Sequence, residues 1–202
     1  MRAPSGYEVI ARSELPLDTV ELARRLIGMV VVRVTLDAVL SGRIVETEAY
    51  PVGDAAGHAY RGETARNHAL FGRRGHAYVY LAYGVSYMLN VSSEAAGVGA
   101  GVLIRALEPL EGIAAMQRNR RVQNLRDLAR GPGRLAAALD IDRRLDGVDL
   151  CQVGPLWLAR DSREASEIGT STRIGLSKNA DRLLRFYVRG DRFVSGPKAL
   201  NR

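Results

Sequence analysis

The sequence predicts an α+β fold: one compact domain with a mostly antiparallel sheet, flanking helices and a protruding β-hairpin. Three observations lead to this prediction. The 202 residues contain no internal repeat, low-complexity tract or linker, so we expect residues 1–202 to form a single domain. Short β-branched runs predict strands, and helix-start and helix-stop signals stand between them. A chain of this length buries roughly 70% of its unfolded surface, which is enough for one hydrophobic core.

The N-terminal part of the chain predicts one helix followed by two strands. Asp18-Thr19-Val20-Glu21 has the spacing of a capping box, with Asp18 as the N-cap and Glu21 three residues later. The helix would end at Gly28, because glycine is the usual residue just past a helix C-terminus. Its apolar side would be formed by Leu22, Ala23, Leu26 and Ile27. The β-branched runs at 29–34 and 42–47 predict the two strands.

After Tyr50 the periodicity gives way to a segment rich in turn residues. Glycine or proline stands at six positions between residues 51 and 75, which indicates an irregular functional surface. Residues 77–81 and 85–92 then predict two strands joined by a turn at Ala82-Tyr83-Gly84. These two strands are the protruding hairpin.

The remaining sequence predicts a mixture of strands and helices. We expect a helix over 109–120 with Pro109 in its first turn, where a missing N–H is tolerated. The other expected elements are strands at 102–107, 153–159 and 184–188 and short helices at 125–130 and 132–139. The order of the strands in the sheet does not follow from the sequence.

The charge of the chain indicates a nucleic-acid partner. There are 29 basic and 22 acidic residues, the net charge is +7 and the pI is near 10.0. Lysine occurs only at Lys178 and Lys198, so nearly all of the positive charge is on arginine, whose planar group suits phosphate. A solvated basic surface without a partner is the alternative, and a pI this high favours nucleic acid over it.

The cysteine content and the hydropathy exclude several other classes. The single cysteine, Cys151, excludes an internal disulfide and a cysteine-rich zinc site, as expected for a reducing cytoplasm. The three histidines are scattered along the chain, so we expect no metal and no other cofactor. No apolar run approaches 18 residues, and residues 1–6 do not resemble a signal peptide, so we expect no membrane span and no leader.

Two features of the sequence carry acid–base chemistry. Glu46 and Glu48 end a predicted strand and point to one face of it, as alternate strand residues do. Arg105 stands among small and apolar residues in another strand, where a buried guanidinium needs a carboxylate partner. Glu48 is an attractive candidate for that partner. A polar strand end and a structural ion pair are the alternatives for these two features.

Tyrosines are crowded into one part of the chain. Six of the eight tyrosines lie between residues 50 and 87. Tyr83 would occupy the tip of the hairpin, which is too exposed for a core residue and suits a wedge that enters a stack of bases. Tyr78 and Tyr80 would share one face, where they could line a cavity for a flat ligand or simply stabilise the sheet.

Several motifs in order along the chain resemble the alkyladenine (3-methyladenine) DNA glycosylase family. They are Arg43-Ile44-Val45-Glu46-Thr47-Glu48-Ala49-Tyr50, His58, Thr64-Ala65-Arg66-Asn67, the run from Gly75 to Gly84, Leu89-Asn90-Val91-Ser92, Arg105-Ala106-Leu107-Glu108-Pro109, Gly131-Pro132-Gly133-Arg134-Leu135 and Arg185-Phe186-Tyr187-Val188-Arg189-Gly190. The resemblance covers essentially the whole chain. It implies a compact α+β domain that flips damaged purine nucleotides out of double-stranded DNA and hydrolyses their base–sugar bond, as a cytoplasmic monomer without a cofactor.

The resemblance also assigns roles to residues. Glu48 matches the general base that activates water, and Arg105 matches the arginine that helps to hold the water and the carboxylate. Tyr83 matches the wedge that fills the gap left in the duplex. The residues that match the base pocket are Tyr50, His58 and Tyr80 as walls and Asn90 as the floor.

The contacts to the DNA backbone are expected from arginines. We select Arg66, Arg73, Arg74 and Arg134 as candidates, the last at the start of a predicted helix. Three departures from the family pattern bear on the range of substrates: Gly57 in place of an alanine, the basic loop at residues 72–75, and about two extra residues around 94–101.

Three competing functions can be separated on the residues present. A bifunctional glycosylase–lyase needs an amine nucleophile, and Lys178 and Lys198 are both remote in sequence from the site. A zinc deaminase needs a Pro-Cys-x-x-Cys motif, which one cysteine excludes. A non-catalytic damage-binding module would share the charge and the aromatic residues, but it would have no use for Glu48 set against a buried Arg105.

Overall fold

The computed structural model describes residues 6–161, 163 and 167–201, and in this part of the chain the strands form one antiparallel sheet. Its main path runs β3-β4-β5-β2-β1-β6, and β8 pairs with both β2 and β7. The strand bounds are β1 Val30–Val34, β2 Val39–Tyr50, β3 Ala77–Ala82, β4 Ser86–Ser92, β5 Gly101–Glu111, β6 Leu156–Ala159, β7 Ile168–Ser171 and β8 Arg185–Val188. The mostly antiparallel sheet predicted from the sequence is confirmed.

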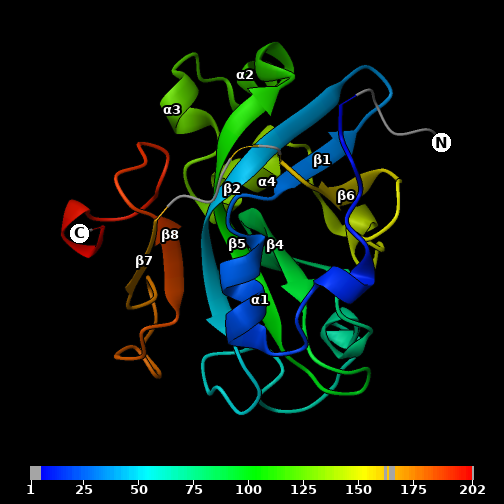
Figure 1. The fold of residues 1–202 in the computed structure, drawn as a ribbon, viewed down its shortest axis with the longest axis vertical. Coiled ribbons are helices and arrows are strands. Elements are labelled where there is room, and N and C mark those ends of the chain that lie inside the picture. Colours follow the sequence, from blue (N-terminus) through cyan, green and yellow to red (C-terminus); the bar gives the residue numbers. More distant parts are fainter. Residues whose placement is uncertain (1–5, 162, 164–166, 202) are drawn as a thin grey trace.

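Strand β2 is the centre of this sheet. Its first half pairs with β1, its second half pairs with β8 at residues 46–48, and β5 pairs with it along almost its whole length. The register against β5 shifts at Ile44/Glu46 and at Glu46/Thr47, and such bulges bend a strand. Strand β2 is therefore irregular at Glu46, and it runs through the middle of the curled sheet (Figure 1).

Four helices cover the described part of the sheet: α1 Thr19–Leu26, α2 Ile113–Arg120, α3 Leu125–Leu128 and α4 Pro132–Ala138. Helix α1 begins as predicted, because the Asp18 carboxylate accepts the backbone N–H groups of Val20 and Glu21. Figure 1 shows α1 lying across β2 and β5, while α2 and α3 gather at the opposite end of β2.

The predicted helix at 109–120 is wrong in its first turn. Strand β5 continues to Glu111 because it stays paired with β2, and Pro109 lies opposite Gly42 next to a register shift, where a proline is tolerated. Gly112, with a left-handed φ of 75°, then turns the chain into α2. The predicted strand at 153–159 starts later, at Leu156, and the sequence patterns missed β7 altogether.

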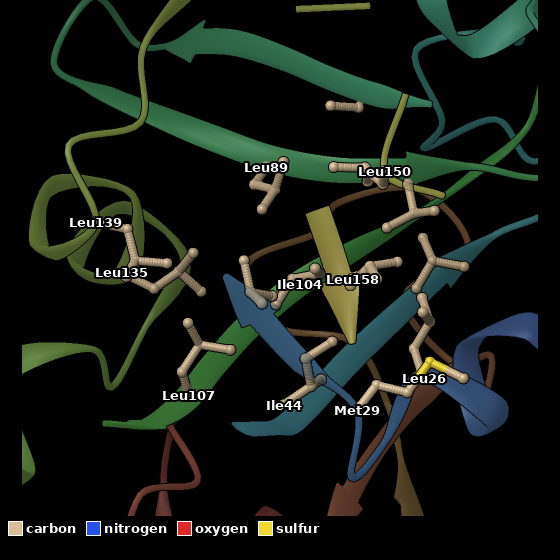
Figure 2. Packing of buried hydrophobic residues seen from close by; sticks show 14 of the residues in the cluster. Leu26, Met29, Ile44, Leu89, Ile104, Leu107, Leu135, Leu139, Leu150 and Leu158 are labelled. Atoms are coloured by element: carbon tan, nitrogen blue, oxygen red, sulfur yellow. The ribbon is translucent and has the colours of Figure 1, made fainter. Parts of the chain in front are cut away.

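The main core lies between the sheet and its helices. Leu22, Ala23 and Leu26 of α1 are completely buried, as the helical pattern predicted. Figure 2 shows Leu26 and Met29 at one end of the cluster and Leu135 and Leu139 at the other, with Ile44 and Ile104 between them. Fully burying each of these side chains stabilises the fold by roughly 1.5–3 kcal/mol.

The hairpin of β3 and β4 extends beyond the core. Its strands stay in register from Ala77↔Val91 to Ala82↔Ser86, and the turn between them is Tyr83-Gly84-Val85. Tyr83 is 96% exposed and has a left-handed φ of 51°. We call Leu81–Val85 the hairpin tip.

The sequence predicted neither a signal peptide nor a membrane-spanning helix. Residues 1–5, on which the expectation of no signal peptide largely rests, lie outside the described residues. Among the described helices, none is long and apolar enough to cross a membrane.

Candidate active site

Glu48 lies near the end of β2 and is completely buried. Its Oε2 accepts a hydrogen bond from the Tyr50 hydroxyl at 2.9 Å and lies 3.2 Å from Nη1 of Arg105. Its Oε1 accepts the backbone N–H of Ile174 at 2.7 Å. The carboxylate is therefore held by three donors, and one of them, Tyr50, also lines a pocket together with other aromatic residues.

Arg105 joins the two glutamates of β2. Its Nε donates to Glu46 Oε1 at 2.9 Å, while its Nη1 faces Glu48. Burial alone would lower the pKa of Arg105, yet Glu48 and Glu46 raise it, so the guanidinium stays charged. The structure thus places Arg105 against Glu48, the partner that the sequence suggested, and also against Glu46.

Glu46 is held by more donors than Glu48, and none of the residues that donate to it lines the pocket. It accepts Nε of Arg185 at 2.7 Å and both the backbone N–H and the hydroxyl of Ser195, at 2.6 and 3.0 Å. Burial would raise the pKa of Glu46, but Arg105 and Arg185 hold it below its ordinary value. The arrangement is that of a structural anchor, a role that the sequence did not assign to Glu46.

A second buried ion pair lies beside Tyr50. Arg173 donates to Asp54 and to the Ala49 carbonyl, the latter at 2.9 Å, and its guanidinium lies 4.6 Å from the centre of the Tyr50 ring. Both members of the pair are fully buried. Since Arg173 directly precedes Ile174, the pair fixes the backbone N–H that binds Glu48. We call Glu46, Glu48, Asp54, Arg105, Arg173 and Arg185 the buried charge cluster.

Aromatic side chains form a pocket of about 200 Å³ above this cluster. Tyr78 and Tyr80 stack at 5.3 Å, and His58 meets Tyr80 edge-on at 4.3 Å. Tyr78, which the sequence treated mainly as a sheet residue, also hydrogen-bonds His58 Nδ1 at 2.9 Å, so it sets the orientation of that ring. The pocket is lined by Tyr50, His58, Tyr78, Tyr80, Tyr83 and Asn90, together with residues of the loops at 51–60 and 99–101.

The ionisation of these rings is set by burial. Burial and then Arg66 lower the pKa of His58, so the ring is neutral near pH 7. Burial raises the pKa of Tyr78 to about 12. The pKa of Tyr50 is also raised, by burial and by Glu48. The pocket therefore presents neutral aromatic faces at neutral pH.

Asn90 lies in β4 opposite Tyr78 and Leu103 and is 7% exposed. It lines the pocket, and its Nδ2 donates to the Tyr78 carbonyl at 3.2 Å. The geometry is therefore compatible with both roles: Asn90 borders the space for a base, and its side chain forms a hydrogen bond with the backbone.

The four arginine candidates for DNA contacts fall into two places. Arg66 donates to the Leu81 carbonyl at the hairpin tip, at 3.4 Å. Arg134 starts α4 next to Gly133, which packs on Ser86 of the hairpin. Arg73 and Arg74 lie at the other end of β3, where Arg74 and Arg12 bond each other's carbonyls. The length of β3, about 20 Å, separates this second pair from Tyr83.

Two of the departures from the family pattern have a structural basis. A Cβ on Gly57 would lie 3.2 Å from the Asp54 carbonyl and 3.6 Å from Cβ of Tyr50, so glycine lets the loop fold tightly beside Tyr50. In the lengthened segment before β5, a Cβ on Gly99 would overlap the Phe71 ring, and Gly99 lines the pocket.

The sequence missed Asp54, Arg173 and Arg185 as parts of the site. Arg185 lies in a motif shared with the family, and its place in a short apolar strand was a signal of the same kind as that of Arg105. Asp54 and Arg173 lie in irregular segments 119 residues apart, where no local pattern points to a pairing. Among the described residues, no group of three or more His, Cys, Asp or Glu side chains could hold a metal ion.

Comparisons with known proteins show the family of this chain, in which an aromatic pocket lies beside a paired carboxylate. The family model for methylpurine-DNA glycosylase (MPG) matches residues 13–192. The chain belongs to this family.

Relatives in other organisms cover nearly the whole chain. A protein of Mesorhizobium japonicum is 72% identical over 95% of this chain and 92% of its own length. One of Paraburkholderia phytofirmans is 51% identical over 95% and 90%, and one of Methanoculleus marisnigri is 44% identical over 88% and 94%. All three bear the name of a 3-methyladenine DNA glycosylase.

Proposed function

We propose that this chain is a monofunctional DNA glycosylase that flips alkylated purine nucleotides from duplex DNA and hydrolyses their N-glycosidic bond. The observation that carries the proposal is the position of Glu48: it is paired with Arg105 and joined through Tyr50 to an aromatic pocket beside an exposed tyrosine. The names of the relatives point to 3-methyladenine as the substrate class. The protein would act in base excision repair, as a cytoplasmic monomer.

The pocket fits the base of such a nucleotide. An alkylated purine is flat and positively charged, and the faces of aromatic rings attract cations. His58 is neutral near pH 7, so it does not repel that charge. The base must leave the stack before its sugar can be attacked, which costs a few kcal/mol. Tyr83, at the exposed tip, is placed to fill the gap and offset part of this cost.

Hydrolysis then needs a water molecule at the sugar. The bond between the anomeric carbon and the base breaks, its electron pair neutralises the cationic base, and the oxygen of water bonds to the carbon. Glu48 takes the proton of that water, and its charge stabilises the oxocarbenium-like transition state. Because three donors now occupy Glu48, the water must displace or join the Tyr50 hydroxyl, the donor on the pocket side.

The monofunctional character depends on the lysines. Lys178, although remote in sequence, borders a second hollow that shares His58, Tyr60 and Tyr78 with the base pocket. The exposed Lys178 therefore lies near the base pocket but is not among the residues that line it. We propose that water, not this amine, attacks the sugar.

The experiment is release of free base from a panel of duplexes that each carry one lesion, 3-methyladenine first. Wild type should release the base in the presence of EDTA and leave an intact abasic site. Borohydride should trap no covalent adduct, whether Lys178 is present or replaced in Lys178→Ala. Binding to damaged duplex without base release from any lesion would identify a damage-binding module instead.

A further inference from the structure

A group of cations outside the base pocket has no carboxylate partner among the described residues. Most arginines in the described part of the chain form ion pairs, such as Arg12 with Asp149, Arg33 with Asp140 and Arg143 with Asp146. Within the same described residues, no carboxylate oxygen lies within the 4.0 Å ion-pair limit of Arg126, Arg130, Arg192 or Lys198. These four cations line one hollow of about 250 Å³ between α3 and the segment after β8. We call it the flank hollow.

The arginines of the flank hollow are oriented but not neutralised. Arg126 donates its Nε to the Arg192 carbonyl at 2.9 Å, and Arg130 donates its Nε to the Val194 carbonyl at 2.9 Å. Each guanidinium is thereby fixed while its two terminal amino groups find no acceptor among the described residues. Arg192 lies over the Phe193 ring at 4.8 Å. Fixed guanidinium groups with free amino groups are suited to bind phosphate oxygens.

The acidic side chain in the hollow does not balance this charge. Asp191 is the only carboxylate among the described residues that line the hollow, and its Oδ1 accepts the backbone N–H of Phe193 at 2.7 Å, which stabilises the local turn. Nearby, burial and the charge of Arg134 lower the pKa of Arg120, so like charges crowd this end of the molecule. An anion that binds here would relieve that repulsion.

The flank hollow is connected to the hairpin tip. Gly131 and Gly133 lie between Arg130 and Arg134, and Gly133 packs on Ser86, which pairs with Ala82 beside Tyr83. The hollow and the hairpin tip are therefore joined through α4. Arg134 of α4 lies between them, where it is ion-paired with the exposed Asp127 of α3 at 3.4 Å. If Tyr83 is inserted into a duplex, the sugar–phosphate backbone on one side of the damaged nucleotide would therefore lie at the hollow.

We propose that the flank hollow binds the sugar–phosphate backbone of the duplex on one side of the damaged nucleotide. This inference rests on the proposed function, since it takes damaged duplex DNA as the ligand. It extends the DNA-contacting surface beyond Arg66, Arg73, Arg74 and Arg134. The hollow reads no bases, so it contributes affinity and not lesion preference.

The test measures the salt dependence of binding. Each arginine that replaces a counterion at a phosphate contributes about 0.9 to the slope of log K against log salt. Arg126→Gln/Arg130→Gln should lower the slope on a long lesion-containing duplex by about two. On duplexes shortened on one side of the lesion, the difference from wild type should vanish for one side only. Arg160→Gln/Arg163→Gln removes the same charge from arginines that are paired with carboxylates, and should leave the slope unchanged.

A second double variant controls for the possibility that the first one lowers the slope only because it is misfolded. Arg192→Gln/Lys198→Gln removes two cations that donate no side-chain hydrogen bond to the backbone of the described chain, and it should lower the slope in the same way. Equal slopes for wild type and both variants on the long duplex would overturn the proposal. So would tight binding of inorganic phosphate in the hollow with an unchanged DNA slope, which would identify a small-anion site. Absence of base release by wild type would instead refute the glycosylase function, which the slope does not measure.

Discussion

The buried charge cluster and the hairpin tip differ in burial and in charge: the cluster consists of buried ionised side chains, and the tip carries exposed uncharged ones. In the cluster, three carboxylates and three guanidinium groups neutralise one another, with Glu46 and Asp54 fully enclosed. At the tip, the side chains of Tyr83 and Val85 are 96% and 82% exposed. Burying charged groups costs several kcal/mol of folding free energy for each ion. Leaving large uncharged side chains exposed contributes no folding free energy. Neither region is what stability alone would select, so each is better explained by function.

The contrast also separates the two glutamates of β2. Glu46 binds Arg185 and Ser195, whereas Glu48 binds Tyr50, which lines the pocket. If this division is correct, one glutamate serves the chemistry and the other serves the fold, although only one residue stands between them.

The largest effect is expected from Glu48→Gln. The substitution removes the negative charge and the general base but keeps the volume and the acceptor for the Ile174 N–H. Base release should fall by a factor of about 10² to 10⁴. Single-turnover release from a 3-methyladenine duplex measures it, with affinity for the same duplex as the control. A variant that keeps more than a tenth of the rate would show that Glu48 is not the base.

Glu46→Gln should act on stability instead. It leaves Arg185 and Arg105 facing a neutral amide inside the protein, and breaking a buried ion pair in this way costs about 3–5 kcal/mol of unfolding free energy. Urea titration of both variants compares the costs. If Glu46→Gln is as stable as wild type but releases no base, the roles of the two glutamates must be exchanged.

Acid should unfold the protein through the same cluster. The pKa values of Glu46 and Asp54 are held below their ordinary values of 4.5 and 3.8, by Arg105 and Arg185 in one case and by Arg173 in the other. A lowered pKa in the folded state means that the stabilisation is present above the ordinary value and is lost as the pH falls through the lowered one. The melting temperature should therefore fall as the pH is lowered below about 4.5. A melting temperature that stays constant from pH 7 to pH 3 would show that these ion pairs do not stabilise the fold.

The sequence predicted what local patterns determine. Helix α1 and strands β1 to β4 follow from capping and β-branched runs, and the pairing of Glu48 with Arg105 follows from the cost of a lone buried guanidinium. The errors arise where pairing between residues far apart in the sequence determines the secondary structure. Strand β5 carries Pro109 as a strand residue because β2 lies beside it, and β7 exists because β8 does. Arg185 and Glu46 lie 139 residues apart, so no spacing could join them.

Asn90→Ser tests the floor of the pocket. Guanine carries an amino group at C2 where adenine-type bases carry hydrogen, and a shorter side chain would leave room for it. The ratio of guanine to alkyladenine release should rise by roughly 10–100-fold, as expected for a loss of 1–3 kcal/mol in discrimination. The alternative is that Asn90 serves only the Tyr78 carbonyl, to which it bonds at 3.2 Å. In that case the variant melts earlier and its ratio equals that of wild type.

Tyr83→Ala tests the hairpin tip and should have the smallest effect on stability. Alanine adopts the left-handed φ of 51° no more easily than tyrosine, and the side chain is 96% exposed, so stability should hardly change. Binding to a lesion in duplex DNA should weaken by about 1–3 kcal/mol, the value of one stacked base. Binding to the same lesion in a single strand should not change, because there is no gap to fill. Val85→Ala is the matched control, since it trims an exposed, non-aromatic side chain of the same tip. Equal losses on duplex and single strand would reassign Tyr83 from the wedge to the pocket wall, which it also lines.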